Sequence, residues 1–158
     1  MTTSVPLSPE QQRLAILQDT RLLDGSEAPA AFQALARLAT QTLSCQAAAI
    51  CVIDNESVHA IASQGWTQRI VALGEAPFDA SAVTGLPSAV DAIASPPLWQ
   101  LGAATSDTPT LLSYARAPLF VEGVCVGCAI ALHSETRNWS SSDLLALDDI
   151  ALSAQTLI

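Results

Sequence analysis

The feature that most limits the possible folds is a pair of strand-like runs near the carboxyl end. Ser113 to Val121 and Val124 to Leu132 are mostly apolar and are separated only by Glu122-Gly123. Two-residue connections that contain glycine are typical of β-hairpins. We therefore expect two neighbouring antiparallel strands, which restricts the fold to one that contains an antiparallel sheet.

A second apolar run predicts a strand at the centre of that sheet. Seven consecutive apolar residues from Ala47 to Ile53 have the length of a strand and leave no polar face, as expected for a strand covered on both sides. Asp54-Asn55-Glu56 predicts a turn. Polar and apolar residues then alternate from Ser57 to Ser63, which predicts a strand that forms a hairpin with Ala47–Ile53. Leu98 to Ala103, which follows two prolines, predicts a short strand near an edge.

Four segments predict helices. Ser8-Pro9-Glu10-Gln11 is a capping pattern that begins a helix over 8–24. Apolar residues at helical spacing predict further helices over 26–43 and 140–157, and a short one over 82–94 that Gly85 and Pro87 interrupt. Residues 67–80 are expected to be a mixed connection. The whole is an α+β domain, with a central antiparallel sheet over 47–132, the short helix inserted in it, and the remaining helices on one face.

Size and charge limit the function. A length of 158 residues suits a single domain over 1–158. The net charge is -9 and all six basic residues are arginine, which argues against binding to nucleic acid or to an anionic membrane surface. No apolar run approaches the roughly 20 residues of a membrane span. The polar amino terminus carries no export signal and the four cysteines form no dense framework, so we expect a cytoplasmic protein with reduced thiols.

The order and spacing of these segments resemble the GAF domain family over nearly the whole chain. The resemblance rests on Arg13–Thr20, Phe32–Ala39, Ala47–Asp54, Tyr114–Leu119, Val121–Ile130 and Asp143–Leu152. The amino-terminal stretch is most similar to GAF domains upstream of bacterial histidine kinase or diguanylate cyclase modules. The resemblance implies a central antiparallel sheet with the terminal helices on one face, often a dimer surface, and a ligand pocket on the other face.

The cysteines and histidines predict no catalytic or metal site. Cys125 and Cys128 are three apart on an extended strand, so their side chains point to opposite faces and roughly 10 Å separates them. We expect buried, inert thiols rather than a zinc site or a disulfide. His59 and His133 belong to no recognisable triad and are expected to be exposed or hydrogen-bonded strand residues.

Arg116 is the strongest candidate for a ligand contact. Strand geometry puts Tyr114 and Arg116 on one face, opposite Ala115 and Ala117. If that face lines the pocket, the guanidinium can bind a carboxylate or a phosphate. The predicted ligand-binding set is Trp66, Phe78, Asp79, Ser81, Trp99, Tyr114 and Arg116. The alternative is a surface arginine paired with an acid such as Glu122, with the aromatic side chains filling the core.

Together with the resemblance, these residues predict a non-enzymatic sensory domain that binds a small molecule, mediates dimerisation, or does both, and so controls a downstream effector module. The homodimer is expected to form through the Ser8–Asp24 and Ser140–Ile158 helices. The cofactor is unknown. The resemblance implies no covalent bilin, because Ser81–Asp91 holds neither cysteine nor histidine, and no cyclic-nucleotide signature, because that motif needs a lysine. Two alternatives stay open, namely a GAF-type free methionine sulfoxide reductase and a degenerate domain used only for subunit assembly.

Overall fold

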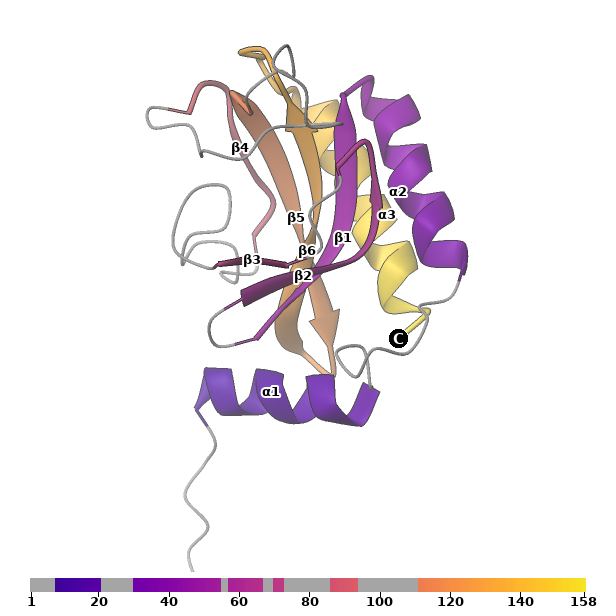
Figure 1. The fold of residues 1–158 in the computed structure, drawn as a ribbon, viewed down its shortest axis with the longest axis vertical. Helices are drawn as coiled ribbons and strands as arrows, with labels where there is room; N and C mark the ends of the chain where they lie inside the picture. The colour runs from indigo at the N-terminus through magenta and orange to yellow at the C-terminus, as the bar shows by residue number, and fades with distance from the viewer. Residues whose placement is uncertain (1–7, 21–29, 55–56, 67–69, 73–85, 94–110) are drawn as a thin grey trace, which may run out of the picture.

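The computed structural model describes residues 8–20, 30–54, 57–66, 70–72, 86–93 and 111–158. Within them six strands form one antiparallel sheet in the order β3-β2-β1-β6-β5-β4, so the first and the last long strands lie side by side at its centre (Figure 1). The strands are β1 (Ala47–Ile53), β2 (Ser57–Gln64), β3 (Ile70–Ala72), β4 (Ser88–Val90), β5 (Ser113–Val121) and β6 (Val124–His133).

The hairpin of β5 and β6 forms where the sequence predicts it. Glu122 and Gly123 have φ angles of 52° and 79°, the two positive values that a type I′ turn requires. The ladder pairs Ser113 with His133 at one end and Val121 with Val124 at the other. All seven residues of β1 are buried, as expected for a strand with neighbours on both sides and cover on both faces.

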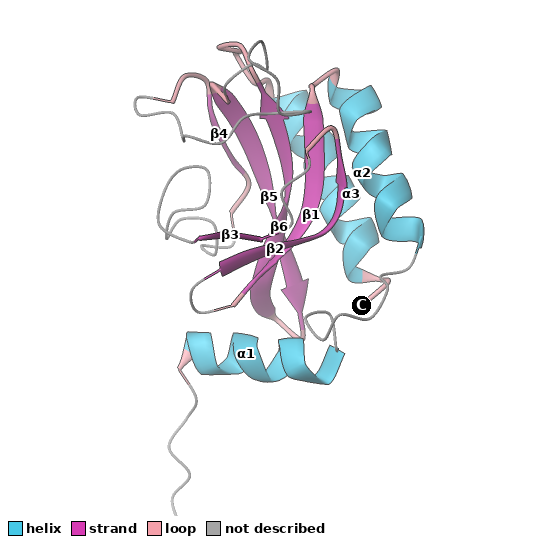
Figure 2. Cartoon of the chain, in the orientation of Figure 1, coloured by secondary structure: helices cyan, strands magenta, loops and turns pink. Residues whose placement is uncertain are grey.

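Two helices cover one face of this sheet, as Figure 2 shows. α2 (Ala30–Leu43) and α3 (Ser141–Gln155) contact each other and pack on the central strands, whereas α1 (Pro9–Thr20) crosses the end of the sheet near the start of β6. Ile16 and Leu17 of α1 belong to the same buried cluster as the other two helices. The predicted α+β arrangement is therefore confirmed, with α2 and α3 on one face of the sheet and α1 across its end.

The sheet separates two buried clusters. The helix-side cluster joins the apolar residues of the three helices to the sheet residues that face them, including Ala48, Ala115, Ala117, Ala129 and Ala131. The far-side cluster lies on the opposite face and consists of Ala47, Ala49, Cys51, Ile53, Val58, Trp66, Ile93, Leu111, Tyr114, Cys128, Ile130 and Leu132. Because β-strand side chains alternate between faces, neighbouring residues of one strand belong to different clusters.

Two helices begin with reciprocal capping. Ser8 and Gln11 exchange hydrogen bonds between side chain and backbone at 2.9 and 3.2 Å at the start of α1. Ser140 and Asp143 do the same at the start of α3. Each pair satisfies amide groups that have no partner inside the helix. The predicted end of the first helix at Asp24-Gly25 and the predicted start of the second at Ser26 lie outside the described residues.

Two short strands correct the sequence-based prediction. The predicted helix over 82–94 is wrong where it is described, because Ser88–Val90 form β4, which pairs with β5. Pro87 opposes a continuous helix there, and the free edge of β5 supplies backbone partners. The expected irregular connection over 67–80 contains β3, which pairs with β2. The predicted strand from Leu98 to Ala103 lies outside the described residues. None of the described helices is long and apolar enough to cross a bilayer.

Candidate functional site

The alternation of β5 places Tyr114 and Arg116 on the face away from the helices. Ala115 and Ala117 belong to the helix-side cluster, whereas Tyr114 belongs to the far-side cluster. Arg116 is two residues from Tyr114 and its guanidinium carbon lies 5.1 Å from the centre of the Tyr114 ring. The two side chains therefore share the far face, and the positive charge is stacked on an aromatic ring.

Arg116 is buried, with 5% of the residue exposed, although a guanidinium remains charged at any ordinary pH. Its Nη2 donates a hydrogen bond of 3.4 Å to Ser88 Oγ. Ser88 lies directly opposite Arg116 in the register of β4 and β5. The alternative of a surface arginine does not hold, because the side chain is enclosed between Tyr114 and the edge strand.

Trp66 is the other described aromatic residue of the predicted ligand-binding set. It follows β2, has 3% of its surface exposed and belongs to the far-side cluster together with Tyr114. Its carbonyl accepts a hydrogen bond of 2.8 Å from Ser63 Oγ, which holds the end of the strand. Of that predicted set, the structure thus places Trp66, Tyr114 and Arg116 on one face. The remaining members, Phe78, Asp79, Ser81 and Trp99, lie outside the described residues.

Ser88 is a residue that the sequence analysis missed. The sequence predicts a helix over 82–94, and a helix would not pair Ser88 with Arg116 on a neighbouring strand. A usable signal is Leu86-Pro87, because proline opposes a helix at that point and the alternation of Ser88, Ala89 and Val90 then fits an edge strand.

Three of the thiols are held in their protonated form. Burial raises the pKa of Cys45 to about 11, and burial also raises the pKa of Cys125. A hydrogen bond with Cys128, together with burial, raises the pKa of Cys51. Because the thiolate is the reactive species, these shifts oppose nucleophilic chemistry at neutral pH. Cys51 and Cys128 are buried as expected, whereas Cys45 and Cys125 are half-buried.

The two histidines occupy ordinary strand positions. His59 Nε2 lies 2.8 Å from Asp54 Oδ2 at the turn between β1 and β2, and both side chains are partly exposed. His133 contacts the Trp139 ring edge to face, with 6.4 Å between the ring centres. Burial and the charge of Arg137 lower the pKa of His133. Among the described residues no three histidine, cysteine or acidic side chains are grouped as metal ligands.

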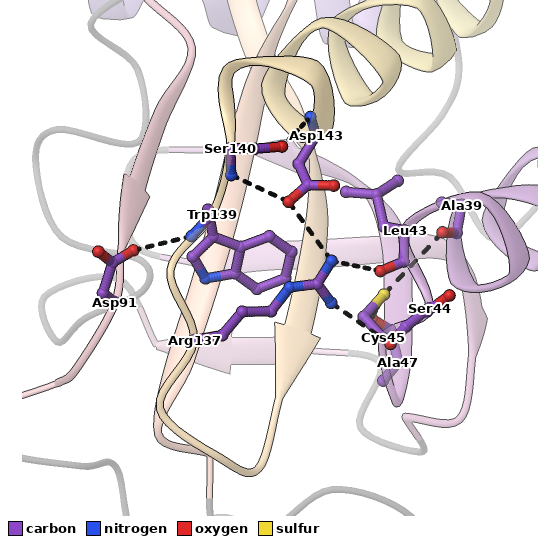
Figure 3. A network of polar contacts seen from close by, with 10 residues as sticks. All are labelled: Ala39, Leu43, Ser44, Cys45, Ala47, Asp91, Arg137, Trp139, Ser140 and Asp143. Atoms are coloured by element: carbon purple, nitrogen blue, oxygen red, sulfur yellow. Dashed lines mark hydrogen bonds and ion pairs between the residues drawn. The ribbon is translucent and has the colours of Figure 1, made fainter.

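A second polar cluster connects the two helices that cover the sheet (Figure 3). The guanidinium of Arg137 donates to the carbonyls of Leu43 and Ser44 at the carboxyl end of α2. The same group lies 3.4 Å from Asp143 Oδ2 in the first turn of α3. Cations near a helix carboxyl end and anions near an amino end are both stabilising. Arg137 thus joins the polar ends of two helices that the fold brings together.

The segment that carries Arg137 also holds the edge of the sheet. The Arg137 guanidinium lies 4.1 Å from the centre of the Trp139 ring. Asp91, just after β4, accepts hydrogen bonds from the amides of both residues, through its carbonyl at 3.0 Å and its carboxylate at 3.2 Å. β4, which carries Ser88, is therefore fixed to the junction of α2 and α3 (Figure 3). No pattern in the sequence points to this role of Arg137.

Comparison with known proteins matches the chain to the GAF domain model over residues 27–158. Solved structures share the fold at low sequence identity. The GAF domain of a phosphoenolpyruvate-protein phosphotransferase from Coxiella burnetii is 14% identical with a TM-score of 0.65, covering 95% of this chain and 94% of that one. A domain of a putative two-component sensor histidine kinase from Sinorhizobium meliloti is 18% identical with a TM-score of 0.59, covering 80% and 87%.

A third solved structure is that of an enzyme. Free methionine-R-sulfoxide reductase from Neisseria meningitidis is 16% identical with a TM-score of 0.63, covering 99% of this chain and 93% of that one. A search of curated proteins found no significant match. Identities this low establish the fold and leave the ligand open, whereas the family model covers most of the sequence. The chain belongs to the GAF domain family.

Proposed function

We propose that this chain is a non-enzymatic sensory domain whose far face binds a small anionic molecule through Arg116. The observation that carries the proposal is the burial of the Arg116 guanidinium on the face that the helices leave uncovered. Burying a charge is costly unless the charge is paired, and the oxyanion of a ligand can pair with a guanidinium. The sensor histidine kinase domain with the same fold supports a signalling role.

The surroundings of Arg116 favour a carboxylate or a phosphate. Tyr114 and Ser88 hold the guanidinium in one orientation. A planar group with a fixed orientation suits two parallel hydrogen bonds to an oxyanion. The apolar far-side cluster excludes water and so strengthens that interaction. Buried apolar surroundings with a few polar groups are typical of small-molecule sites.

The proposal is tested by thermal unfolding with four probes, namely succinate, citrate, inorganic phosphate and AMP. A ligand present at 100 times its Kd adds about 2.7 kcal/mol to the free energy of unfolding, which raises Tm by several degrees. Arg116→Gln should abolish the rise. Arg37→Gln, on the exposed side of α2, should retain it. A rise that survives Arg116→Gln, or no rise with any of the probes, contradicts the proposal.

The reductase from Neisseria meningitidis supplies the alternative function of methionine sulfoxide reduction. That chemistry needs a reactive thiolate, and the raised pKa values of Cys45, Cys51 and Cys125 oppose it. We expect no turnover of free methionine-R-sulfoxide with a thiol reductant. Turnover that is lost when the four cysteines are replaced would overturn the non-enzymatic proposal.

For assembly, we propose that two copies associate through the outer side of the helical layer. Leu145 and Leu152 are seven residues apart on α3 and are 64% and 50% exposed, the spacing of one seam of a helix pair. The described exposed residues of α1 are mostly polar, so α1 supports the dimer less than the sequence analysis expected. Sedimentation should show a dimer that Leu145→Glu dissociates and Leu86→Glu leaves intact. A stable monomer, or a dimer that survives Leu145→Glu, contradicts this assembly.

A further inference from the structure

Cys51 and Cys128 lie directly opposite each other at the centre of the sheet. The register of β1 and β6 pairs them, although they are 77 positions apart in the sequence. Their exposed fractions are 0% and 1%, and both belong to the far-side cluster. Two thiols therefore point to the same face from the two central strands.

The geometry of such a pair suits a disulfide. Directly opposite residues of antiparallel strands have Cα atoms about 4.5–5.5 Å apart. Disulfides form when the Cα atoms are about 4.4–6.8 Å apart. The two side chains also interact, since a side-chain hydrogen bond with Cys128 contributes to the raised pKa of Cys51. The register of β1 and β6 therefore brings the two residues within the Cα separation that a disulfide needs.

We propose that Cys51 and Cys128 are a modification site that forms a cross-strand disulfide by exchange with a low-molecular-weight disulfide such as oxidised glutathione. One cysteine attacks a glutathione sulfur, forms a mixed disulfide and releases one reduced glutathione. The other cysteine then attacks the protein sulfur of that mixed disulfide and releases a second. The two thiols lose two protons and two electrons, and one oxidised glutathione becomes two reduced molecules.

Burial determines how fast the bond forms. Because both thiols are inaccessible and Cys51 is held protonated, attack in the native protein is slow. Unfolding exposes both residues, so refolding in a glutathione buffer reaches the equilibrium state. The bond closes a long loop in the unfolded chain, which favours the folded state. We expect the oxidised protein to melt about 5–10 °C higher than the reduced protein.

The experiment uses a variant that keeps only this pair, Cys45→Ser with Cys125→Ser. Trypsin cleaves after arginine and yields fragments 38–69 and 117–137, each of which holds two cysteines in the unmodified chain. In the variant each fragment holds one, so a link between them identifies the bond. After refolding with excess oxidised glutathione we expect a mass about 2 Da lower, linked fragments that dithiothreitol separates, and a higher Tm that reverts on reduction.

The matched control is Cys51→Ala with Cys128→Ala, which keeps the two half-buried thiols. Alanine is used because a buried serine would leave a hydroxyl without a partner. This control should show neither the mass loss nor linked fragments. If the serine variant does not fold, the same positions are replaced by alanine. Free thiols at Cys51 and Cys128 after refolding, or linked fragments that form equally in the control, overturn the proposal, which does not depend on the proposed ligand.

Discussion

The two faces of the sheet are built from different residues. Toward the helices the strands present six alanines of the helix-side cluster, together with a few larger side chains such as Ile50 and Leu119, so α2 and α3 can approach the sheet closely. On the far face the same strands carry Tyr114, the thiols of Cys51 and Cys128, and the buried guanidinium of Arg116. Small residues make one face a packing surface, while the two thiols and the guanidinium lie on the other. We therefore assign stability to the helix side and propose recognition for the far face.

Gly127→Ala is expected to have one of the two largest effects, because it disrupts the pairing of the central strands on which both faces depend. A Cβ at Gly127 would meet the backbone carbonyl of Cys51 and approach the backbone of Val52. Since β1 and β6 cannot separate without breaking the central ladder, we expect a loss of about 3 kcal/mol in the free energy of unfolding, measured by urea denaturation.

The control for this change is Gly123→Asn. Gly123 has a φ of 79°, and a Cβ at this position would have no other atom within 4 Å. Asparagine also tolerates positive φ. Its effect should stay within about 0.5 kcal/mol. A neutral Gly127→Ala would show that the central strands are less tightly paired than the structure indicates.

Leu147→Ala disrupts the helical face alone. Leu147 is fully buried between α3 and the sheet, so its loss leaves a cavity that should cost about 2–5 kcal/mol. Leu145→Ala, on the exposed side of the same helix, should cost less than about 0.5 kcal/mol in the monomer. Urea denaturation gives the free energy of unfolding of both variants. Equal losses would contradict the placement of Leu147 on the side of α3 that faces the sheet.

Arg137→Lys separates the role of the half-buried Arg137 from that of the buried Arg116. Lysine keeps the charge but loses the fork that reaches the α2 carbonyls and the stack on Trp139. We expect a loss of about 1–2 kcal/mol in the free energy of unfolding with ligand-induced stabilisation unchanged. Arg116→Gln should leave the free energy of unfolding unchanged and abolish the ligand-induced stabilisation. If Arg137→Lys removes the ligand-induced stabilisation, the assignment of packing to one face and of recognition to the other is wrong.

The smallest effect is a pH dependence that comes from His133. Its pKa is lowered in the folded protein by burial and by Arg137, so the unfolded chain binds more protons between the two pKa values. Stability is therefore complete above the unfolded pKa of about 6.5 and falls as pH decreases through the folded pKa. His133→Asn should flatten the Tm profile in this window, and an unchanged slope would assign it to other groups.

Local sequence patterns predict the elements that have a clear hydrophobic periodicity, a turn signal or a helix-capping residue. The hairpin at Glu122-Gly123, the apolar run at Ala47–Ile53 and the capping residue Ser8 each determine their neighbours directly. β3 and β4 were missed because three residues carry no usable period and their partners are distant in sequence.

The candidate site was predictable only in part for the same reason. Side chains alternate along one strand, so Tyr114 and Arg116 can be placed on the same face without knowing which strands are neighbours. The pairing of Cys51 with Cys128 and of Ser88 with Arg116 depends on the register between strands, which only the folded structure reveals.

Binding of a ligand at the far face through Arg116 can be observed residue by residue. The most direct measurement is a correlation NMR spectrum of the arginine Nε–Hε groups, recorded while succinate or AMP is added. The chain has six arginines and no lysine, so few signals need assignment. The account predicts that the Arg116 signal shifts first and saturates, while Arg37 on the helical side does not move. A saturating shift at Arg37 or Arg137 with none at Arg116 would contradict it.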